Sequence, residues 1–252
     1  MLYKNTGVID FIFDIMASKD FSNNLNILKI LIILMESKNI GFKEIIEMNF
    51  IERINFLIDR TLKSTNKNYN IQDEESSYLD YVFELFYDMI TKLFEYKKQK
   101  YPKNMKIDIN AYKKDYSSKI ESIGKNFNLF IKFLGNQKNV NLQEISCVSL
   151  IIILQVFPGC KIDSLNLELN FKGSDIPNLL KGLELSCQKI HKKMIHIFQW
   201  IVQFQNDANK ILKPYLPYLI TYLENICNTS VDPDVIRTAQ HFLDNEINSL
   251  KK

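Results

Sequence analysis

Glycine and proline are scarce in this chain. Its 252 residues include seven glycines and six prolines. Because these two residues form most tight turns, their scarcity disfavours a turn-rich all-β protein. Both residues also weaken a helix interior, so a chain with few of them suits long helices. The composition therefore predicts a helical fold.

Arginine is rarer still, which bears on function. The chain has three arginines (Arg53, Arg60 and Arg237) and a net charge of +3. The planar arginine fork is the favoured group for recognising phosphates and bases. A net charge of this size does not by itself imply a nucleic-acid partner. Nucleic-acid binding is therefore not the leading hypothesis.

Signatures of catalysis are missing from the sequence. There is no glycine-rich phosphate loop, H-E-x-x-H, G-x-S-x-G or kinase motif. His191 and His196 stand five residues apart, a poor spacing for a metal pair on a helix. Cys187 and His191 have the spacing of a nucleophile and its base, but Cys187 is expected on a buried stripe, where a thiol is inert. The run Asp73-Glu74-Glu75, assigned to a loop, lacks the spacing of a calcium site. We expect no enzyme, cofactor or metal.

The four cysteines indicate the compartment. Cys147, Cys160, Cys187 and Cys227 form no C-x-x-C pair, and three of them fall in apolar helical patterns. Buried free thiols in a reducing compartment are the expected state. No signal peptide is visible, and the longest apolar runs are too short to span a bilayer. We expect an intracellular, cytoplasmic protein, with the nucleus left open.

Apolar residues recur every three or four positions through most of the chain, which predicts helices. Asn141, Asp175 and Asp232 are expected as helix N-caps. Polar loops over about 64–78 and 101–118 are expected to interrupt the pattern, and a polar helix is expected near Tyr112. The expected helices cover 7–17, 23–37, 40–46, 50–62, 78–100, 127–134, 141–156, 176–187, 189–204, 215–228 and 232–250.

The apolar run 148–157 has the isoleucines of a buried strand, but the cap before it and its length favour a helix. The last helix is expected to bury one stripe of side chains. These are Ile236, Ala239, Leu243, Ile247 and Leu250.

A segment of eleven residues recurs forty positions later. Residues 177–187 align with 217–227, and Pro, two Leu, Glu and Cys are identical at five aligned positions. A fainter echo relates 7–12 to 49–54 at an offset of forty-two. Such a period in a helical chain is typical of a stacked solenoid. An irregular helical bundle is the alternative.

The same residues resemble a known family. Residues 127–157, reading FNLFIKFLGNQKNVNLQEISCVSLIIILQVF, look like the second and third helices of an armadillo unit. The tail LPYLITYLENICNTSVDPDVIRTAQHFL looks like the same pair again, and MNFIERINFLIDRTLKS is similar to the start of a unit. HEAT repeats share these patterns. The resemblance implies an all-α, right-handed α-solenoid of about five partly irregular armadillo-like repeats, filling a single domain over 1–252.

The resemblance also implies a function. Armadillo-like proteins are non-enzymatic scaffolds or adaptors, and their third helices line a concave face that binds an extended peptide or a helix of another protein. The Trp and Asn ladder of the nuclear-import members is absent, so binding of nuclear signals is not expected. We expect a protein partner and a role as a subunit of a larger assembly. The candidate groove residues are Lys189, Lys193, Gln199, Gln203, Arg237 and Gln240.

A basic stretch carries the alternative function. Residues 97–125 hold nine lysines against three acidic residues, with three tyrosines interleaved and a fourth, Tyr96, directly before them. Such a surface could bind RNA, membrane headgroups or another anionic surface. A solvated loop kept soluble by its lysines is the simpler interpretation. The patch residues are Lys97, Lys98, Lys100, Lys103, Lys106, Lys113 and Lys114.

Overall fold

The computed structural model describes residues 6–16, 21–36, 45, 47–64, 73–100, 126–135, 140–156, 171–184 and 188–250. Every element in these ranges is helical, and no strand occurs among them, which confirms the predicted all-α class. Within the same ranges, no helix is both long enough and apolar enough to cross a membrane. The loop expected over 101–118, the helix near Tyr112 and most of the helix over 40–46 lie outside the described residues.

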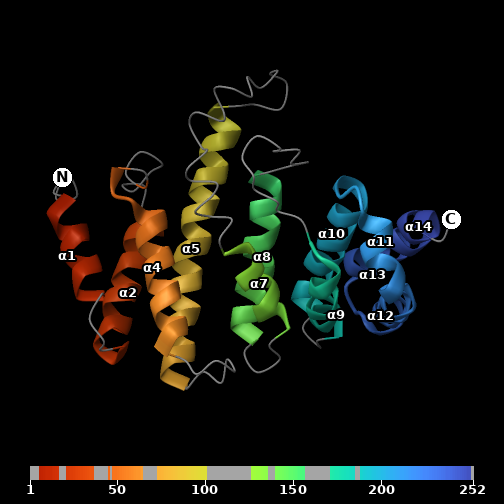
Figure 1. The fold of residues 1–252 in the computed structure, drawn as a ribbon, viewed down its shortest axis with the longest axis horizontal. Helices are drawn as coiled ribbons and strands as arrows, with labels where there is room; N and C mark the ends of the chain where they lie inside the picture. The colour runs from red at the N-terminus through yellow and green to blue at the C-terminus, as the bar shows by residue number, and fades with distance from the viewer. Residues whose placement is uncertain are drawn as a thin grey trace. The chain divides into compact units, whose positions relative to one another are not determined.

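The chain forms two compact units, Met1–Asn126 and Phe127–Lys252. The N-terminal unit holds α1 (Thr6–Met16), α2 (Phe21–Glu36), α4 (Phe50–Ser64) and α5 (Asp73–Lys100) (Figure 1). Helix α2 packs against both α1 and α5, and α4 packs against α5. The rings of Phe13 and Phe50 pack edge to face with their centroids 5.3 Å apart, and Arg53 forms an ion pair with Asp10. Helix α4 therefore also contacts α1. Two helix pairs, α1–α2 and α4–α5, therefore lie side by side.

The C-terminus of α1 is hydrogen-bonded to both α2 and α4. The last carbonyls of a helix have no partner within the helix. Here the Met16 carbonyl accepts hydrogen bonds from Asn24 Nδ2 at 3.5 Å and from Arg60 Nη1 at 3.3 Å. Asn24 is buried on α2, and Arg60 belongs to α4. One helix end thus binds side chains from two neighbouring helices.

The C-terminal unit is a series of helix pairs joined by shorter helical turns. Its longer helices are α7 (Phe127–Leu134), α8 (Val140–Val156), α9 (Ile176–Glu184), α10 (Gln188–Phe204), α12 (Leu216–Thr229) and α13 (Pro233–His241). The shorter segments are η2 (Gly173–Asp175), α11 (Ala208–Leu212), η3 (Lys213–Tyr215), η4 (Phe242–Ile247) and α14 (Asn248–Leu250).

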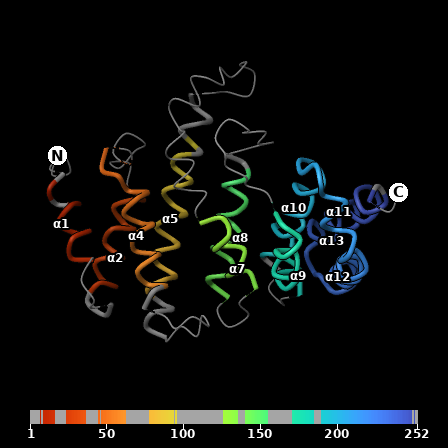
Figure 2. The backbone as a smooth tube through the Cα atoms, viewed as in Figure 1, coloured from red at the N-terminus to blue at the C-terminus, as the bar shows by residue number. Residues whose placement is uncertain are grey.

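The helices of this unit pack in two rows. Each of α7, α9 and α12 contacts the partner that follows it, namely α8, α10 and α13. Along one row α9 contacts both α7 and α12, and along the other α10 contacts both α8 and α13. The pairs follow one another in chain order (Figure 2). A buried apolar stripe on each helix, such as Phe127, Phe130, Ile131 and Leu134 on α7, forms the core between the rows.

The forty-residue echo corresponds to equivalent helices of two successive pairs. Helices α9 and α12 each begin one residue before a proline, Pro177 or Pro217, which suits the first turn because proline has no amide hydrogen to leave unpaired. Leu179 and Leu219 are both buried, as are Leu183 and Leu223. The N-terminal echo likewise relates the first turns of α1 and α4.

Helix α9 begins differently from the prediction. Asp175 does not cap α9 but ends the short η2 turn, where its carboxylate accepts a hydrogen bond from the Lys172 amide at 2.7 Å. The segment before η2 is held by Gln205, which is buried between α10 and α11. Gln205 Oε1 accepts from the Phe171 amide at 3.1 Å, and Gln205 Nε2 donates to the Phe171 carbonyl at 2.6 Å. The side chain of Gln205 therefore satisfies both the backbone amide and the backbone carbonyl of Phe171.

A π-helical segment, η4, interrupts the last helix. Asp232 caps α13 as predicted, since its Oδ1 accepts from the Asp234 amide at 2.8 Å. The predicted buried stripe is wrong at two positions. Val235 and Phe242 are buried where Ile236 and Leu243 were expected, and Ile236 and Leu243 are half-buried. A π turn holds more residues than an α turn, so the buried positions run from Phe242 to Ile247, five residues on.

Two other predicted boundaries differ from the structure, and the strand considered for 148–157 is a helix. Helix α5 begins at Asp73, so Asp73-Glu74-Glu75 lies in its first turn and not in a loop, a composition that the positive end of a helix dipole favours. Helix α8 begins at Val140, which puts Asn141 inside the first turn and not at the cap. The same helix runs to Val156, so the strand alternative is wrong.

Candidate functional site

The helices predicted to carry the partner-binding residues are neighbours in the C-terminal unit. Helix α10 contacts both α8 and α13. Polar side chains on the solvent side of these helices bridge from one helix to the next. We call this side the α8–α10–α13 surface. It is defined by Glu144, Lys192, Lys193, Gln199, Asp234 and Glu246.

Two ion pairs link α10 to its neighbours. Lys193 Nζ lies 3.7 Å from Glu144 Oε1 on α8, and Lys192 Nζ lies 3.6 Å from Asp234 Oδ2 on α13. The four side chains are 35–59% exposed. Ion pairs this exposed contribute about 0–1 kcal/mol each, because water and salt screen them. The bridges therefore orient side chains without fixing them in place.

A third bridge lies one to two turns further along α10. Gln199 Nε2 is 3.5 Å from Glu246 Oε1, and His241 Nδ1 is 3.6 Å from Glu246 Oε2. The side chain of Glu246 is 13% exposed, while that of His241 is 62% exposed. The contact with His241 is an ion pair only when the imidazole is protonated. Glu246 comes from the π-helical segment, so the irregular turn places this carboxylate beside α10.

Four of the six candidate groove residues have a described polar contact or line a hollow. Lys193 and Gln199 belong to the bridges above. Arg237 Nη1 lies 3.3 Å from Asp234 Oδ1 and its side chain is 79% exposed. Gln240 Nε2 donates to Asp244 Oδ1 at 3.0 Å. Gln203 is exposed on α10, and the side chain of Lys189 is outside the part of the chain that the structure describes.

Sequence reasoning missed the partners of these residues. Glu144, Lys192, Asp234 and Glu246 all lie on the helices predicted to form the groove. Which of their side chains meet depends on how each helix is rotated about its axis, and no local pattern encodes that rotation. The position of Glu246 depends in addition on the π-helical turn.

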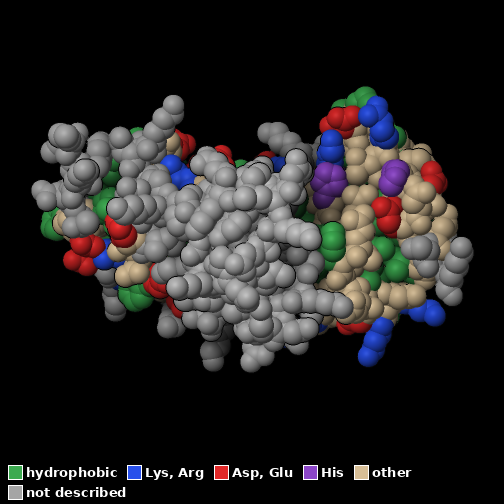
Figure 3. All heavy atoms as spheres, turned by 90° about the horizontal axis from the view of Figure 1, so that it is seen from above, with side chains coloured by type: hydrophobic (Ala, Val, Ile, Leu, Met, Phe, Trp, Pro, Cys, Tyr) green, Lys and Arg blue, Asp and Glu red, His purple; other side chains and the backbone are tan. Residues whose placement is uncertain are grey.

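A histidine stands among the lysines of α10. His196 is exposed, and partial burial followed by the charge of Lys192 lowers its pKa from the usual value. Its imidazole is therefore neutral at pH 7. Figure 3 shows histidine, lysine and acidic side chains together on the surface of the C-terminal unit. The surface thus carries charges of both signs and neutral polar groups.

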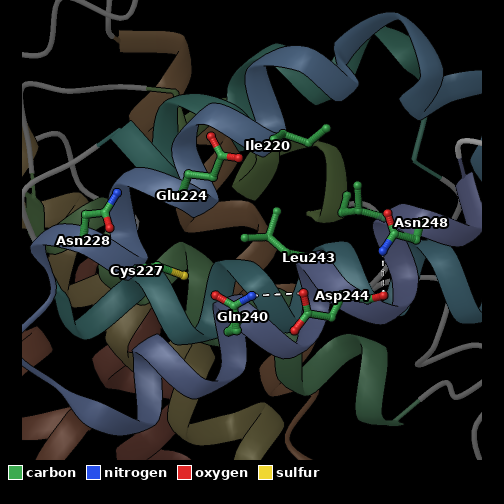
Figure 4. Close-up of a pocket in the computed structure, with 9 residues that line it drawn as sticks. Ile220, Glu224, Cys227, Asn228, Gln240, Leu243, Asp244 and Asn248 are labelled. Atoms are coloured by element: carbon green, nitrogen blue, oxygen red, sulfur yellow. Dashed lines mark hydrogen bonds between the residues drawn. The ribbon is translucent and has the colours of Figure 1, made fainter.

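A hollow of about 330 Å³ lies between α12 and the stretch that runs from the end of α13 through η4 to α14 (Figure 4). Gln240 and Asn248 both bond to Asp244 at its edge, with Asn248 Nδ2 donating to the Asp244 carbonyl at 2.8 Å. The described lining is mostly polar. It consists of Ile220, Glu224, Cys227, Asn228, Gln240, Leu243, Asp244, Ile247 and Asn248.

The cysteine in this hollow is not activated. Partial burial, then the carboxylates of Asp244 and Glu224, raise the pKa of the Cys227 thiol, so the nucleophilic thiolate is disfavoured. Cys227 is half-buried, whereas the sequence predicted full burial. Cys147 is fully buried as predicted, with its Sγ 3.5 Å from Met194 Sδ, and burial raises its pKa to about 12. Cys160 and Cys187 lie outside the described residues, and with them the Cys187–His191 pair.

The remaining candidates do not assemble into a site. His191 is buried and His196 is exposed, so the two do not share a face of α10. Among the described residues, no three His, Cys, Asp or Glu side chains are placed to hold a metal ion. Of the basic patch, Lys97, Lys98 and Lys100 belong to the last turns of α5, but their side chains are outside the described part. Lys103, Lys106, Lys113 and Lys114 lie outside it entirely.

Comparison with known proteins gives no relative. The chain matches no protein-family model, no curated protein and no solved structure.

Proposed function

We propose that the chain is an armadillo/HEAT-like α-solenoid that acts as a non-enzymatic scaffold, binding a segment of another protein across the α8–α10–α13 surface. Five helix pairs among the described residues support the solenoid. They are α1–α2, α4–α5, α7–α8, α9–α10 and α12–α13. Short helical segments precede two of the pairs, η2 before α9 and α11 with η3 before α12, as the first helix of a three-helix unit would.

The observation that carries the binding proposal is the set of weak bridges on three neighbouring helices. A partner that approaches this surface meets lysines, carboxylates and amides already spaced by a rigid helical row. The ion pairs of Lys192 and Lys193 are long and half-exposed, so replacing either one by a contact to the partner costs little. Because these helices are already ordered, binding the partner does not require the ordering of a loop in this chain, which would cost conformational entropy.

The chemistry of the surface indicates the kind of segment it would accept. Lys192, Lys193 and Arg237 offer positive charge, while Gln199 and Gln203 can bond to a peptide backbone. Phe204, at the end of α10, is 49% exposed and can contact an apolar side chain. An extended or helical segment with two or more acidic residues fits this arrangement.

Charge reversal tests the proposal. The variant Lys192→Glu/Lys193→Glu is expected to lose partners that the wild-type chain retains from a native extract, and to lower the affinity of a purified partner segment at least about tenfold. The matched control is Lys210→Glu/Lys213→Glu, which reverses two exposed lysines on α11 and η3. Quantitative mass spectrometry of the retained proteins and calorimetry of the purified pair give the readouts.

A second variant separates binding from stability. Glu144→Gln/Asp234→Asn breaks the ion pairs of Lys192 and Lys193, and that of Arg237 with Asp234, but leaves all three cations free to meet the partner. Affinity is then expected to stay equal or to rise a few-fold, because the intramolecular competitors are gone. Partner binding that is indifferent to Lys192 and Lys193, or that is lost equally in the control, rules out this surface as the site.

A further inference from the structure

The hollow beside α12 has an apolar floor and a polar rim. Side chains line it from two directions, from α12 on one side and from α13, η4 and α14 on the other (Figure 4). Ile247 is buried, and Ile220 and Leu243 are half-buried, whereas the amide and carboxylate residues of the lining are exposed. This combination suits a ligand that has both an apolar and a polar part.

Two amides of the rim are oriented by Asp244. Gln240 Nε2 donates to Asp244 Oδ1 at 3.0 Å, and Asn248 Nδ2 donates to the Asp244 carbonyl at 2.8 Å. Figure 4 shows both amide nitrogens directed at Asp244. The amide oxygens of Gln240 and Asn248 are left without a hydrogen-bond donor among the described residues. Asp244 thus fixes two side chains whose oxygens can accept hydrogen bonds from a ligand.

The rim carries negative charge with no cation beside it. Glu224 and Asn228, one turn apart on α12, form no side-chain hydrogen bond or ion pair with another described residue. None of the nine described lining residues is Lys, Arg or His. The charge acts inside the hollow, because partial burial and then the carboxylates of Asp244 and Glu224 raise the pKa of the Cys227 thiol. A positively charged ligand would therefore meet two carboxylates here.

The lining favours an organic cation over a metal ion. Among the described residues, no three His, Cys, Asp or Glu side chains are placed to hold a metal. The acceptors of the rim come from both sides of the hollow and are mostly neutral amides. A guanidinium has five N–H donors in one plane and can bond to several such acceptors at once, while an ammonium is a compact charge with three donors. A volume of about 330 Å³ is at the lower end for ligand pockets, which suits a single side chain.

We propose that this hollow binds the guanidinium group of an arginine side chain that belongs to another protein. Glu224 and Asp244 pair with its charge, and the amide oxygens of the rim accept its remaining N–H groups. Its aliphatic stem packs against Ile220 and Leu243. Because both carboxylates are exposed, the guanidinium alone binds weakly, in the millimolar range, and a protein supplies the further contacts that a free amino acid lacks. The proposal does not depend on the partner proposed for the α8–α10–α13 surface.

An NMR titration of the full chain at constant ionic strength tests the proposal. The probe is N-acetyl-arginine methylamide, and the matched neutral probe is N-acetyl-citrulline methylamide, which has a urea group in place of the guanidinium. The arginine probe is expected to shift the backbone amide signals of residues 220–228 and 240–248 saturably, and the citrulline probe to bind at least about tenfold more weakly. The Cβ signal of Cys227 should report a lower thiol pKa when the arginine probe is bound, because the guanidinium offsets the two carboxylates.

Free L-arginine distinguishes the two sources of the guanidinium. Its α-carboxylate is repelled by the acidic rim, so it should bind no more tightly than the blocked probe, which mimics an arginine within a chain. Tighter binding of free L-arginine would overturn the assignment to an arginine of another protein.

Isosteric substitutions locate the site. Glu224→Gln/Asp244→Asn removes both charges but keeps an oxygen for Gln240, and it is expected to weaken binding of the arginine probe at least about tenfold. The matched control, Asp14→Asn/Asp59→Asn, removes two exposed carboxylates from the N-terminal unit and should bind like the wild type. Equal binding of the citrulline probe, equal weakening in the control, or shifts that spread over the surface without saturating would each overturn the proposal. So would a Cys227 pKa that the arginine probe leaves unchanged.

Discussion

At the residue scale, the environment of Asp88 on α5 disfavours the charged form of its carboxyl group. Burial, followed by the charges of Glu84 and Glu36, raises its pKa to about 6, against the opposing effect of Lys92. Its Oδ2 is buried and has no hydrogen-bond partner among the described residues. An ionised Asp88 therefore lowers the stability of the folded state at neutral pH.

Asp88→Asn is expected to stabilise the protein at pH 7 and to remove a pH dependence. The pKa of Asp88 is raised in the folded state above its unfolded value of about 4, so folding favours the protonated form. Wild-type stability should therefore rise as pH falls from about 7 to about 4 through this group. The variant should gain about 1 kcal/mol at pH 7, after allowance for solvent screening of a half-exposed group. Urea unfolding at pH 4.5 and pH 7 measures both effects.

The control for Asp88 is an exposed carboxylate of the same unit. Asp59→Asn on α4 removes the same charge from a solvent-exposed position. Its effect on stability should stay within about 0.5 kcal/mol at both pH values. A loss of stability in Asp88→Asn at pH 7 would show that the carboxylate is satisfied in the folded protein.

At the element scale, apolar periodicity predicted most helices but not their irregular ends. Phe127, Phe130, Ile131 and Leu134 show the spacing of a helix face in the sequence and are all buried on α7. The π-helical segment η4 was not predictable, because its extra residue per turn is set by packing Phe242 and Ile247 into the core. Local sequence carries no signal for that choice, since an α-helical register through Leu243 is equally apolar.

The start of α9 illustrates a second limit. Aspartate before an apolar run predicts an N-cap, yet Asp175 bonds to Lys172 in the η2 turn. The chain before this turn is fixed by Gln205, which is thirty-four residues away from Phe171 in the sequence. A contact over that distance leaves no local pattern. The sequence therefore predicts α9 itself but not the hydrogen bonds of Gln205 and Asp175 that fix the chain before it.

Gln205→Ala is expected to loosen the chain from Phe171 into α9. The change removes two buried hydrogen bonds to one residue's backbone and should cost about 2–3 kcal/mol. Hydrogen exchange measured by mass spectrometry should show lost protection in peptides spanning 171–184. Gln205→Glu keeps an acceptor for the Phe171 amide but puts a carboxylate against the Phe171 carbonyl and Asp207, so it should not restore protection.

Gln203→Ala provides the comparison for this prediction. Gln203 lies on the same helix but is exposed. Exchange in 171–184 should be unchanged in that variant. If Gln205→Ala also left exchange there unchanged, the hydrogen bonds to Phe171 would not be what holds the segment.

At the scale of the whole molecule, the sequence echoes located equivalent helices but not the grouping of the pairs. Ile9 and Ile12 of α1 are buried like Ile51 and Ile54 of α4, and the prolines of α9 and α12 occupy the same position. A repeat is detectable because each pair must bury the same stripe against its neighbours. The division into two compact units depends on which contacts are made, and nothing in the repeat pattern marks it. The single domain over 1–252 stays a prediction.

For the α8–α10–α13 surface, too, the sequence predicted the helices but not the contacts between their side chains. The three helices of the α8–α10–α13 surface were identified from their spacing, and Lys193 and Gln199 do bridge to neighbouring helices. The pairings themselves join residues more than forty positions apart. They follow from tertiary packing, so the sequence supplied candidate positions and the structure supplies their partners.

Matched cavities in the two units test how far each unit is stable on its own. Ile54→Ala on α4 and Leu223→Ala on α12 each truncate a side chain with no exposed surface, and each should cost about 2–5 kcal/mol. If the units are separate cooperative blocks, hydrogen exchange in Ile54→Ala should accelerate in α1, α2, α4 and α5 while α9, α10, α12 and α13 keep their protection. Leu223→Ala should give the reverse pattern. Acceleration spread through both units in either variant would instead show a single cooperative domain over 1–252, in which each helix pair depends on every other.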